Sequence, residues 1–392
     1  MPSTDFPRLA DLPPYVLGAV DDRKSELRAR GEDVFDFGLG NPDRPTPGPV
    51  VEELRARALD DAEHRYLPSP GTAGLRTAIA RWYARRYDVT LDPATECVAT
   101  IGSKEGLGHL LLAVVGPGDV VLVPDPCYPI HRFGVHFAGG VVAPVPTAPD
   151  RDPLKELDDA WHAAPRPPKL AIVNFPHNPT TASIDERAMT GLVQWAKRRD
   201  VWLISDLAYA DLAFEGRTPS ALAVPGARSH VVEFFTTSKS FNMPGWRVGF
   251  CVGNPQLVGA LRRIKGYLDY GIFGPVQSAA IVALDHGDAF AAQTCALYRQ
   301  RAEALHRGLG DAGWPVDMPR GTMFLWAPVP ERFRALGSVG FAMKLLDEAR
   351  VAVAPGVGFG PGGEGAVRFG LVEEVPRIEA ACRAIGRVLR RS

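Results

Sequence analysis

The sequence predicts an α/β protein with a large domain, built on a mostly parallel central sheet with helices on both faces, and a smaller α+β domain. Short apolar runs rich in β-branched residues alternate with helical patterns between about residues 95 and 268, as in strands buried on both faces. The last third instead mixes long helices with isolated strands. The length of 392 residues also exceeds the roughly 250–300 residues that a single core usually supports.

The segment before the large sheet is predicted to form two helices and one short strand. Residues 15–31 show a charged helical pattern, and 34–37 (VFDF) have the composition of a strand. Residues 72–87 place apolar side chains at helical spacing. Because the large sheet starts only near residue 95, we expect the first segment to pack with the small domain. The predicted units are residues 1–47, 48–287 and 288–392.

The elements of the two domains follow in order from the same patterns. The strands of the large sheet are expected at 97–101, 120–123, 169–175, 201–205, 231–237 and 248–253. Helical stretches between them include 104–115, 183–199 and 255–268. The last third is expected to hold long helices over 275–313, strands at 322–328, 351–355 and 366–370, and a closing helix.

The composition excludes several classes of protein. With 45 acidic and 44 basic side chains, the chain has no electrostatic footprint for nucleic acid or an anionic membrane. No apolar run approaches the ~20 residues of a membrane span. Five scattered cysteines without a C-x-x-C pair predict no metal site and a reducing cytoplasm. The N-terminus shows no signal peptide. We therefore expect a cytoplasmic protein.

Polar residues with distinctive chemistry follow the predicted strands. In open α/β sheets, ligands bind beyond the carboxyl ends of the strands, so these residues are expected to meet at one rim. A lysine, an aspartate, an asparagine, a tyrosine and a helix start rich in Gly and Ser meet the needs of pyridoxal 5′-phosphate. They are Lys239, Asp206, Asn178, Tyr128 and Gly102-Ser103-Lys104.

Lys239 is the central candidate. A lysine forms a Schiff base with an aldehyde and is exchanged by an incoming amine. Thr236 and Ser238 offer hydroxyls nearby, and Arg247 offers a fork of donors for phosphate oxygens. Taken alone, Lys239 would be interpreted as a surface lysine in a polar turn, and only the neighbouring candidates favour the Schiff base.

Asp206 is expected to bind a protonated pyridine nitrogen, because a carboxylate at the end of an apolar strand is costly to bury without a cation. Its alternative role is a helix N-cap. Tyr209 and Asn178 could each reach the phenolic oxygen of the same ring. Asn178 alone could also be an ordinary Asn-Pro turn.

Gly102, Ser103 and Lys104 open a helix whose free N–H groups form an anion site suited to a phosphate monoester. The glycine spacing does not match a Walker A loop. Tyr128 could stack on the cofactor ring or pack in the core. Arg368, on a short strand, could hold a substrate carboxylate in a forked contact, or could be a surface arginine.

From about residue 10 to the C-terminus, the sequence resembles the class I/II aminotransferases of the fold-type I, pyridoxal-phosphate-dependent superfamily. The motifs that carry the resemblance are FGLGNPD, IGSKEGL, PDPCYP, NFPHNPT, SDLAYAD, TTSKSFNMPGWRVGF and PGVGFG…VRFG, with a Tyr66…Gly71…Leu75-Arg76 block. Further segments (LPPYV, VEFFT, IKGYLDYG) resemble bacterial alanine (glutamate–pyruvate) aminotransferases and LL-diaminopimelate aminotransferases.

The resemblance implies a homodimer with active sites at the subunit interface, acting on an amino acid and a 2-oxo acid. It implies that Lys239 is the Schiff-base lysine and proton shuttle. The other implied cofactor contacts are Asp206 on the ring nitrogen, Asn178 and Tyr209 on the ring oxygen, Tyr128 on the ring face, and Ser103, Lys104, Ser238 and Arg247 around the phosphate. Tyr66 is implied to reach the phosphate of the neighbouring chain. Arg368 and Gly40 are implied to bind the substrate carboxylate and to close the pocket floor.

The sequence departs from the family pattern at Thr181, Phe241, Gly274 and residues 67–70. By the resemblance, residues 67–70 and 274 line the partner's substrate pocket, so these two departures concern the substrate and not the cofactor. Transamination by a ping-pong mechanism, with alanine and glutamate as the default pair, is therefore the leading hypothesis. Another pyridoxal-phosphate reaction on the same scaffold, such as a lyase, a cyclase or a carbon–carbon bond former, is the alternative. A transcriptional regulator would need an added DNA-binding segment. A nicotinamide dehydrogenase would need a G-x-G-x-x-G turn that we do not find.

Overall fold

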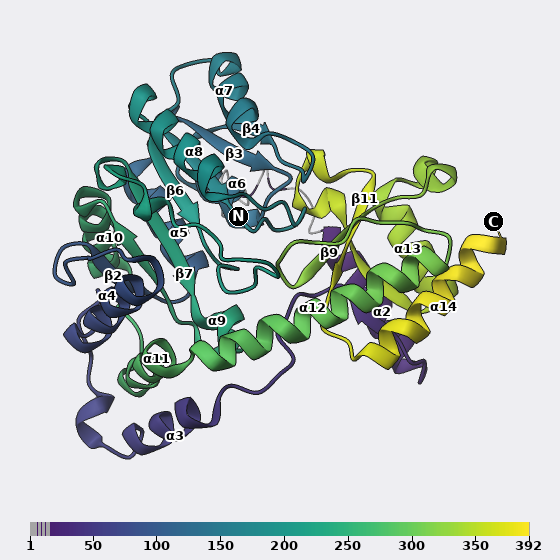
Figure 1. The fold of residues 1–392 in the computed structure, drawn as a ribbon, viewed down its shortest axis with the longest axis horizontal. Helices are drawn as coiled ribbons and strands as arrows, with labels where there is room; N and C mark the ends of the chain where they lie inside the picture. Colours follow the sequence, from purple (N-terminus) through teal and green to yellow (C-terminus); the bar gives the residue numbers. More distant parts are fainter. Residues whose placement is uncertain (1–5, 7–8, 10–11, 13–15, 392) are drawn as a thin grey trace, which may run out of the picture.

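The computed structural model describes residues 6, 9, 12 and 16–391 and contains two sheets that lie side by side (Figure 1). The larger sheet has seven strands and the smaller has four. The predicted large α/β domain and small α+β domain are therefore confirmed. The LPPYV segment and the start of the predicted unit 1–47 lie mostly outside the described residues.

The seven-stranded sheet is mostly parallel, and only β8 runs antiparallel to its neighbours. Its strand order is β2 (Cys97–Thr100), β8 (Gly249–Gly253), β7 (Val231–Thr236), β6 (Trp202–Asp206), β5 (Leu170–Asn174), β3 (Val120–Asp125) and β4 (Val141–Pro146). Val121 and Leu122 show why both faces are apolar, since each packs into a different core on its side of the sheet.

Helices cover both faces of this sheet. One face carries α4 (Ala73–Tyr87), α7 (Pro153–Ala163), α8 (Glu186–Arg199) and α11 (Gly274–His286). The other carries α5 (Ser103–Val114), α6 (Pro129–Phe137) and α10 (Pro255–Leu268). Two of these helices and one strand of the sheet were not predicted from the sequence. Helices α6 and α7 were not expected, nor was the edge strand β4, whose two prolines are tolerated because an edge strand needs fewer ladder bonds.

The small sheet has the order β1 (Phe35–Phe37), β10 (Val351–Pro355), β11 (Ala366–Gly370) and β9 (Phe324–Pro328). Strand β1 pairs in parallel with β10, and the other pairs are antiparallel. The helices α2 (Val16–Ala29), α13 (Gly337–Ala349) and α14 (Val375–Arg391) pack against it. The segment around β1 is thus built into the small sheet.

Helix α12 (Asp288–Asp311) runs along both parts of the molecule (Figure 1). Ala291 near its start packs in the core of the large sheet, whereas Tyr298 and the apolar residues after it pack in the core of the small one. Further along the helix, the wholly buried Arg301 binds both carboxylate oxygens of Asp43 at 2.7 Å, which ties the early chain to this helix. The exact domain boundaries stay a prediction.

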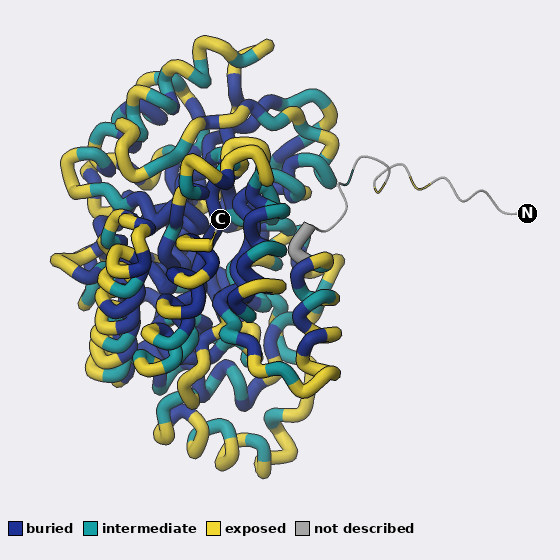
Figure 2. Tube along the Cα trace, turned by 90° about the vertical axis from the view of Figure 1, so that its right-hand side faces the viewer, coloured by how far each residue is buried: buried dark blue, intermediate teal, exposed yellow. Residues whose placement is uncertain are grey.

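Figure 2 shows the buried residues gathered in the interior, with exposed residues on the outer turns of the helices. Helix α3 (Gly48–Arg57) lies at the periphery and packs on α11. No helix among the described residues is long and apolar enough to cross a membrane.

Candidate active site

The carboxyl ends of five parallel strands meet at one rim of the large sheet, and the candidate residues follow them. Strand β2 shares its direction with β7 because both are antiparallel to β8. Asp206 is the last residue of β6, and Lys239 lies in the short helix α9 (Thr237–Ser240) directly after β7. Asn178 and Tyr128 follow β5 and β3. The spatial order of the strands therefore brings side chains that are far apart in sequence to one place.

Lys239 faces the segment that leads into the large domain. Its Nζ donates a hydrogen bond to the carbonyl oxygen of Gly40 at 3.0 Å. Gly40 itself leaves no room for a side chain, because a Cβ there would overlap the ring of Phe324. Burial, followed by the positive charges of Arg368 and Arg247, lowers the pKa of Lys239 from 10.5 to about 8. A lysine of this kind holds a useful fraction of neutral amine near physiological pH, as a nucleophile must.

Asp206 is buried and held by two donors. Its Oδ1 accepts from the backbone N–H of Ala208 at 3.1 Å, and its Oδ2 lies 2.9 Å from Nε2 of His131. His131 is wholly buried in α6, three residues after Tyr128, and no sequence pattern predicted it as a site residue. These two contacts fix the orientation of the Asp206 carboxylate at the end of β6. His177 is buried nearby, and burial together with His131 lowers its pKa to about 3, which keeps it neutral.

Asn178 joins the two domains through its side-chain amide. Its Nδ2 donates to the hydroxyl of Tyr209 at 3.2 Å, and its Oδ1 accepts from Nη1 of Arg368 at 2.7 Å. Asn174, the last residue of β5, fixes the loop by accepting from the N–H of Asn178 at 3.0 Å and donating to the carbonyl of Asp206 at 2.8 Å. Burial raises the pKa of Tyr209 well above its usual value, so its hydroxyl stays protonated.

Arg368 comes from β11 in the small sheet and lies between two aromatic rings. Its guanidinium carbon is 4.0 Å from the ring centre of Phe324 and 4.4 Å from that of Phe359. Such stacking leaves the planar edge of the guanidinium available for forked contacts with a carboxylate. Neither aromatic residue was expected at the site.

The start of α5 and the loop after β7 form an anion cradle. Gly102 precedes α5 with φ +76°, and a Cβ there would collide with the guanidinium of Arg247. Ser103 begins the helix, whose first-turn N–H groups have no intrahelical partner. The Thr236 hydroxyl donates to the Ser238 hydroxyl at 2.9 Å. Helix N–H groups, hydroxyls and a guanidinium are the donor set that a phosphate monoester needs, so the residues present fit the cofactor.

Lys104 and Tyr66 are two predicted cofactor ligands with exposed side chains. Lys104 is exposed, with its Nζ 5.8 Å from the ring centre of Tyr128. Tyr66 is 84% exposed, and its ring packs against Tyr270 with the ring centres 4.7 Å apart. The prediction for Tyr66 concerns the site of a neighbouring chain and stays a prediction.

Comparison with known proteins decides the family. Residues 32–385 match the family model described as aminotransferase class I and II. The chain belongs to the class I and II aminotransferases. It is 48% identical to glutamate-pyruvate aminotransferase AlaC of Escherichia coli K12, over 99% of this chain and 95% of that protein. It is 42% identical to an LL-diaminopimelate aminotransferase of Nitratidesulfovibrio vulgaris Hildenborough, over 97% of this chain and 98% of that one.

Solved structures also superimpose closely on the chain over nearly its whole length. The substrate-bound BacF structure from Bacillus subtilis matches with a TM-score of 0.92 and 31% identity, covering 99% of this chain and 98% of that one. A single mutant of Thermus thermophilus aspartate aminotransferase matches with a TM-score of 0.91 and 29% identity, covering 98% of this chain and all of that one. The predicted family and aminotransferase activity are thus confirmed, and the family is one that depends on pyridoxal phosphate.

Proposed function

We propose that this aminotransferase binds pyridoxal 5′-phosphate at the rim of the large sheet and moves an amino group between an L-amino acid and a 2-oxo acid. The observation that carries the proposal is the amine of Lys239, with a pKa of about 8, placed on the same rim as a buried carboxylate and an anion cradle. When bound, the cofactor supplies a ring that withdraws electrons from the substrate's Cα.

Each part of the site has a separate task in this proposal. The phosphate is held by the start of α5 and the loop after β7, through Gly102, Ser103, Lys104, Thr236, Ser238 and Arg247. Asp206, oriented by His131, pairs with the protonated ring nitrogen. Asn178 and Tyr209 donate to the ring oxygen, and Tyr128 covers one ring face. The rim thus combines a set of anion donors with one buried carboxylate, which fits a ligand with an anionic and a cationic end.

Arg368 binds the α-carboxylate of the substrate, and Asn178 orients it. Their 2.7 Å hydrogen bond links the small domain to the large one at the point where the carboxylate enters. With the carboxylate fixed, the neutral amine of Lys239 accepts the proton from Cα at its Nζ and later releases it. A second substrate, the 2-oxo acid, uses the same groups in reverse order, which gives ping-pong kinetics. The E. coli relative is a glutamate-pyruvate aminotransferase, which supports glutamate and pyruvate, and hence alanine as the product of pyruvate, as the default substrates.

We also propose that a second copy of the chain covers an exposed aromatic patch, defined as Leu59, Tyr66, Tyr267, Tyr270 and Phe273. All five are exposed, Tyr267 to 86%, and Tyr66 and Tyr270 are in ring contact. Large apolar and aromatic side chains left exposed in this way support a protein interface. A homodimer would bring Tyr66 to the phosphate of the partner's site. Five free thiols support a location in the cytoplasm.

Borohydride reduction tests the core of the proposal. The wild-type chain should retain the cofactor covalently after reduction, as should Lys155→Ala, which removes an exposed lysine. Lys239→Ala should retain none, and a variant that still traps the cofactor would contradict the assignment. Adding an amino donor alone should lower the absorbance of the bound cofactor, and a 2-oxo acid should restore it. A band that never falls with any donor would exclude transamination.

The dimer has its own test. Lys239→Ala and Tyr66→Phe chains, each impaired alone, should regain activity when mixed under conditions that exchange subunits. One of the two sites in a hybrid dimer would then contain both native residues. Mixtures no more active than the separate variants would contradict shared sites.

A further inference from the structure

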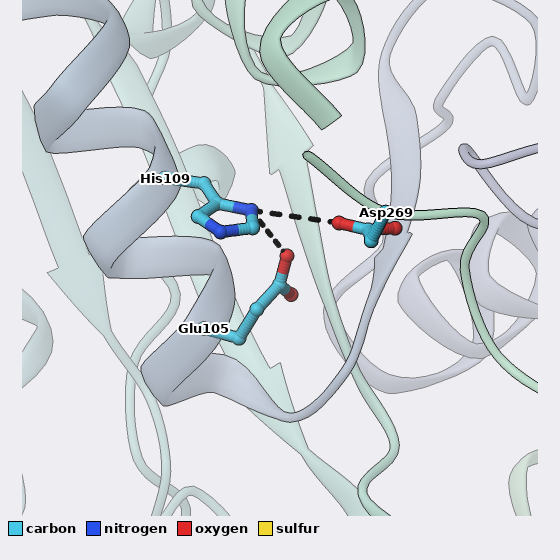
Figure 3. Close-up of side chains that lie close together, drawn as sticks. All are labelled: Glu105, His109 and Asp269. Atoms are coloured by element: carbon cyan, nitrogen blue, oxygen red, sulfur yellow. Dashed lines mark ion pairs between the residues drawn. The ribbon is translucent and has the colours of Figure 1, made fainter. Parts of the chain in front are cut away.

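A second cluster of charged side chains lies beside the first turn of α5 (Figure 3). His109 Nδ1 contacts Glu105 Oε1 at 2.5 Å and lies 3.6 Å from Asp269 Oδ2. Lys265, near the end of α10, extends its ammonium between the same two carboxylates. Its Nζ is 2.9 Å from Glu105 Oε1 and 3.0 Å from Asp269 Oδ2, and its side chain is wholly buried.

This cluster has the residue types of a metal site, but the lysine supplies the cation. Ligand-type atoms of Glu105, His109 and Asp269 lie within 4.8 Å of one another. The Lys265 ammonium is already within hydrogen-bond distance of both carboxylates. A metal ion bound by the same oxygens would have to displace a fixed positive charge, which Coulomb repulsion opposes. The cluster is therefore an ion-pair network within the protein.

Glu105 connects the network to the anion cradle. Its Oε2 accepts from the backbone N–H of Ile101 at 2.8 Å and so closes the turn that leads into α5. The bond is similar to one half of a helix capping box, but it reaches the residue before the N-cap Gly102, which has no side chain to complete the box. Burial opposes ionisation of Glu105, but His109 and Lys265 outweigh it and lower its pKa to about 2. The turn that this bond closes carries Gly102, Ser103 and Lys104.

Asp269 connects the same lysine to the aromatic patch. Its Oδ1 accepts from the N–H of Gly271 at 2.7 Å, and its backbone carbonyl accepts from the Ser69 hydroxyl at 2.8 Å. Tyr270, the next residue, packs on Tyr66. The buried ammonium of Lys265 thus links the first turn of α5 to the two segments, around Tyr66 and Tyr270, that carry the aromatic patch.

We propose that Lys265 is a positioning residue for the cofactor phosphate: its buried ammonium, acting through Glu105, holds the first turn of α5 in the geometry that binds the anion. This rests on the proposed function of the cradle. A buried ion pair adds little net stability compared with apolar residues of similar size. Removing only the lysine leaves the two carboxylates without their ammonium and also lowers the stability of the fold. What Lys265 contributes to the site is the orientation of one turn, which is why the test compares ligands with and without a phosphate.

The test compares the affinity for pyridoxal 5′-phosphate with that for pyridoxal, which lacks the phosphate. Lys265→Met and Glu105→Gln should each raise Kd for the phosphorylated form about tenfold, the usual effect of losing one hydrogen bond to a charged group. Kd for pyridoxal should change less than about twofold. Lys155→Met is the matched control, because Lys155 makes the same i,i+4 contact to an aspartate, at 2.6 Å, on an exposed surface. It should change neither value.

A double variant tests whether Lys265 works through Glu105. If it does, Lys265→Met with Glu105→Gln should bind pyridoxal 5′-phosphate no more weakly than Glu105→Gln alone, since the two residues share one interaction. Additive losses, or equal losses for pyridoxal and its phosphate, would overturn the proposal. Should Lys265→Met fail to fold, Glu105→Gln alone tests the proposal, through its change in Kd for pyridoxal 5′-phosphate relative to its change in Kd for pyridoxal. A wild-type chain that captures no pyridoxal 5′-phosphate would refute the proposed function itself, which is a different outcome.

Discussion

Lys239 should make the cofactor-free protein less stable than a variant without it. Its pKa of about 8, against 10.5 for the free side chain, means that the folded protein disfavours the ammonium by about 3 kcal/mol. Lys239→Met removes this cost and loses the hydrogen bond to Gly40, which contributes about 1 kcal/mol. At pH 7 the variant apoprotein should therefore be more stable by about 2 kcal/mol.

The sign of the pH dependence follows from the same pKa. Below pH 8 the folded protein carries the full cost of the ammonium. Between about 8 and 10.5 the folded protein has lost the proton that the unfolded chain still binds, so the stability of the wild type rises with pH relative to the variant. The advantage of Lys239→Met should therefore shrink to nearly nothing around pH 9.5–10, where the remaining cost is roughly that of the lost hydrogen bond.

Urea unfolding of the apoproteins, followed by tryptophan fluorescence at pH 7 and pH 9.5, measures this difference. Lys155→Met, at an exposed site, serves as the control and should show no pH-dependent difference. A wild-type apoprotein as stable as Lys239→Met at pH 7, or a difference independent of pH, would refute the reasoning. It would mean that solvent reaches the lysine and relieves its burial.

Three further predictions test other parts of the molecule. Arg368→Lys should lower kcat/KM about a hundredfold with unchanged cofactor absorbance, because a lysine cannot make a forked contact to the carboxylate; an unchanged kcat/KM would place the carboxylate elsewhere. Gly102→Ala should weaken cofactor binding at least tenfold, because an alanine adopts the positive φ of Gly102 only with strain and its Cβ would push the Arg247 guanidinium aside. Gly245→Ala, at a position in open space, should not weaken it. Burial raises the pKa of Glu233 to about 7, although its hydrogen-bond donors act to lower it. Because the folded protein then holds a proton that the unfolded chain releases, the free energy of unfolding of the wild type should fall by about 3 kcal/mol between pH 4.5 and 7. Thermal midpoints of Glu233→Gln, which lacks this titration, should not show that loss.

Much of the candidate site could be predicted because its residues directly follow strands that the sequence pattern indicates clearly. Lys239, Asp206 and Asn178 come after runs that are apolar on both faces, and the carboxyl ends of such strands share an edge. The resemblance then supplied Tyr66 and Gly40, which no strand pattern marks. Strand β4 was missed because its exposed positions and two prolines have the composition of a loop.

The residues that were missed act through tertiary contacts. His131 meets Asp206 across 75 positions of sequence, and nothing on its own helix distinguishes it from a core histidine. Phe324 and Phe359 enclose Arg368 because β9 and the turn after β10 both lie beside β11 in the folded small sheet. Lys265, four residues before Asp269, has the spacing of an ordinary surface pair, and only the packing of α10 on α5 buries it.

Helix α12 bears on the distance between the group that binds the substrate carboxylate and the amine that reacts. Arg368 lies on β11 of the small sheet and Lys239 directly follows β7 of the large sheet, and this single helix is packed into the cores of both sheets. The gap between the carboxylate anchor and the reacting amine is therefore set by neither sheet alone. It depends on how the two sheets are held together, by α12 and by the direct hydrogen bond from Arg368 to Asn178.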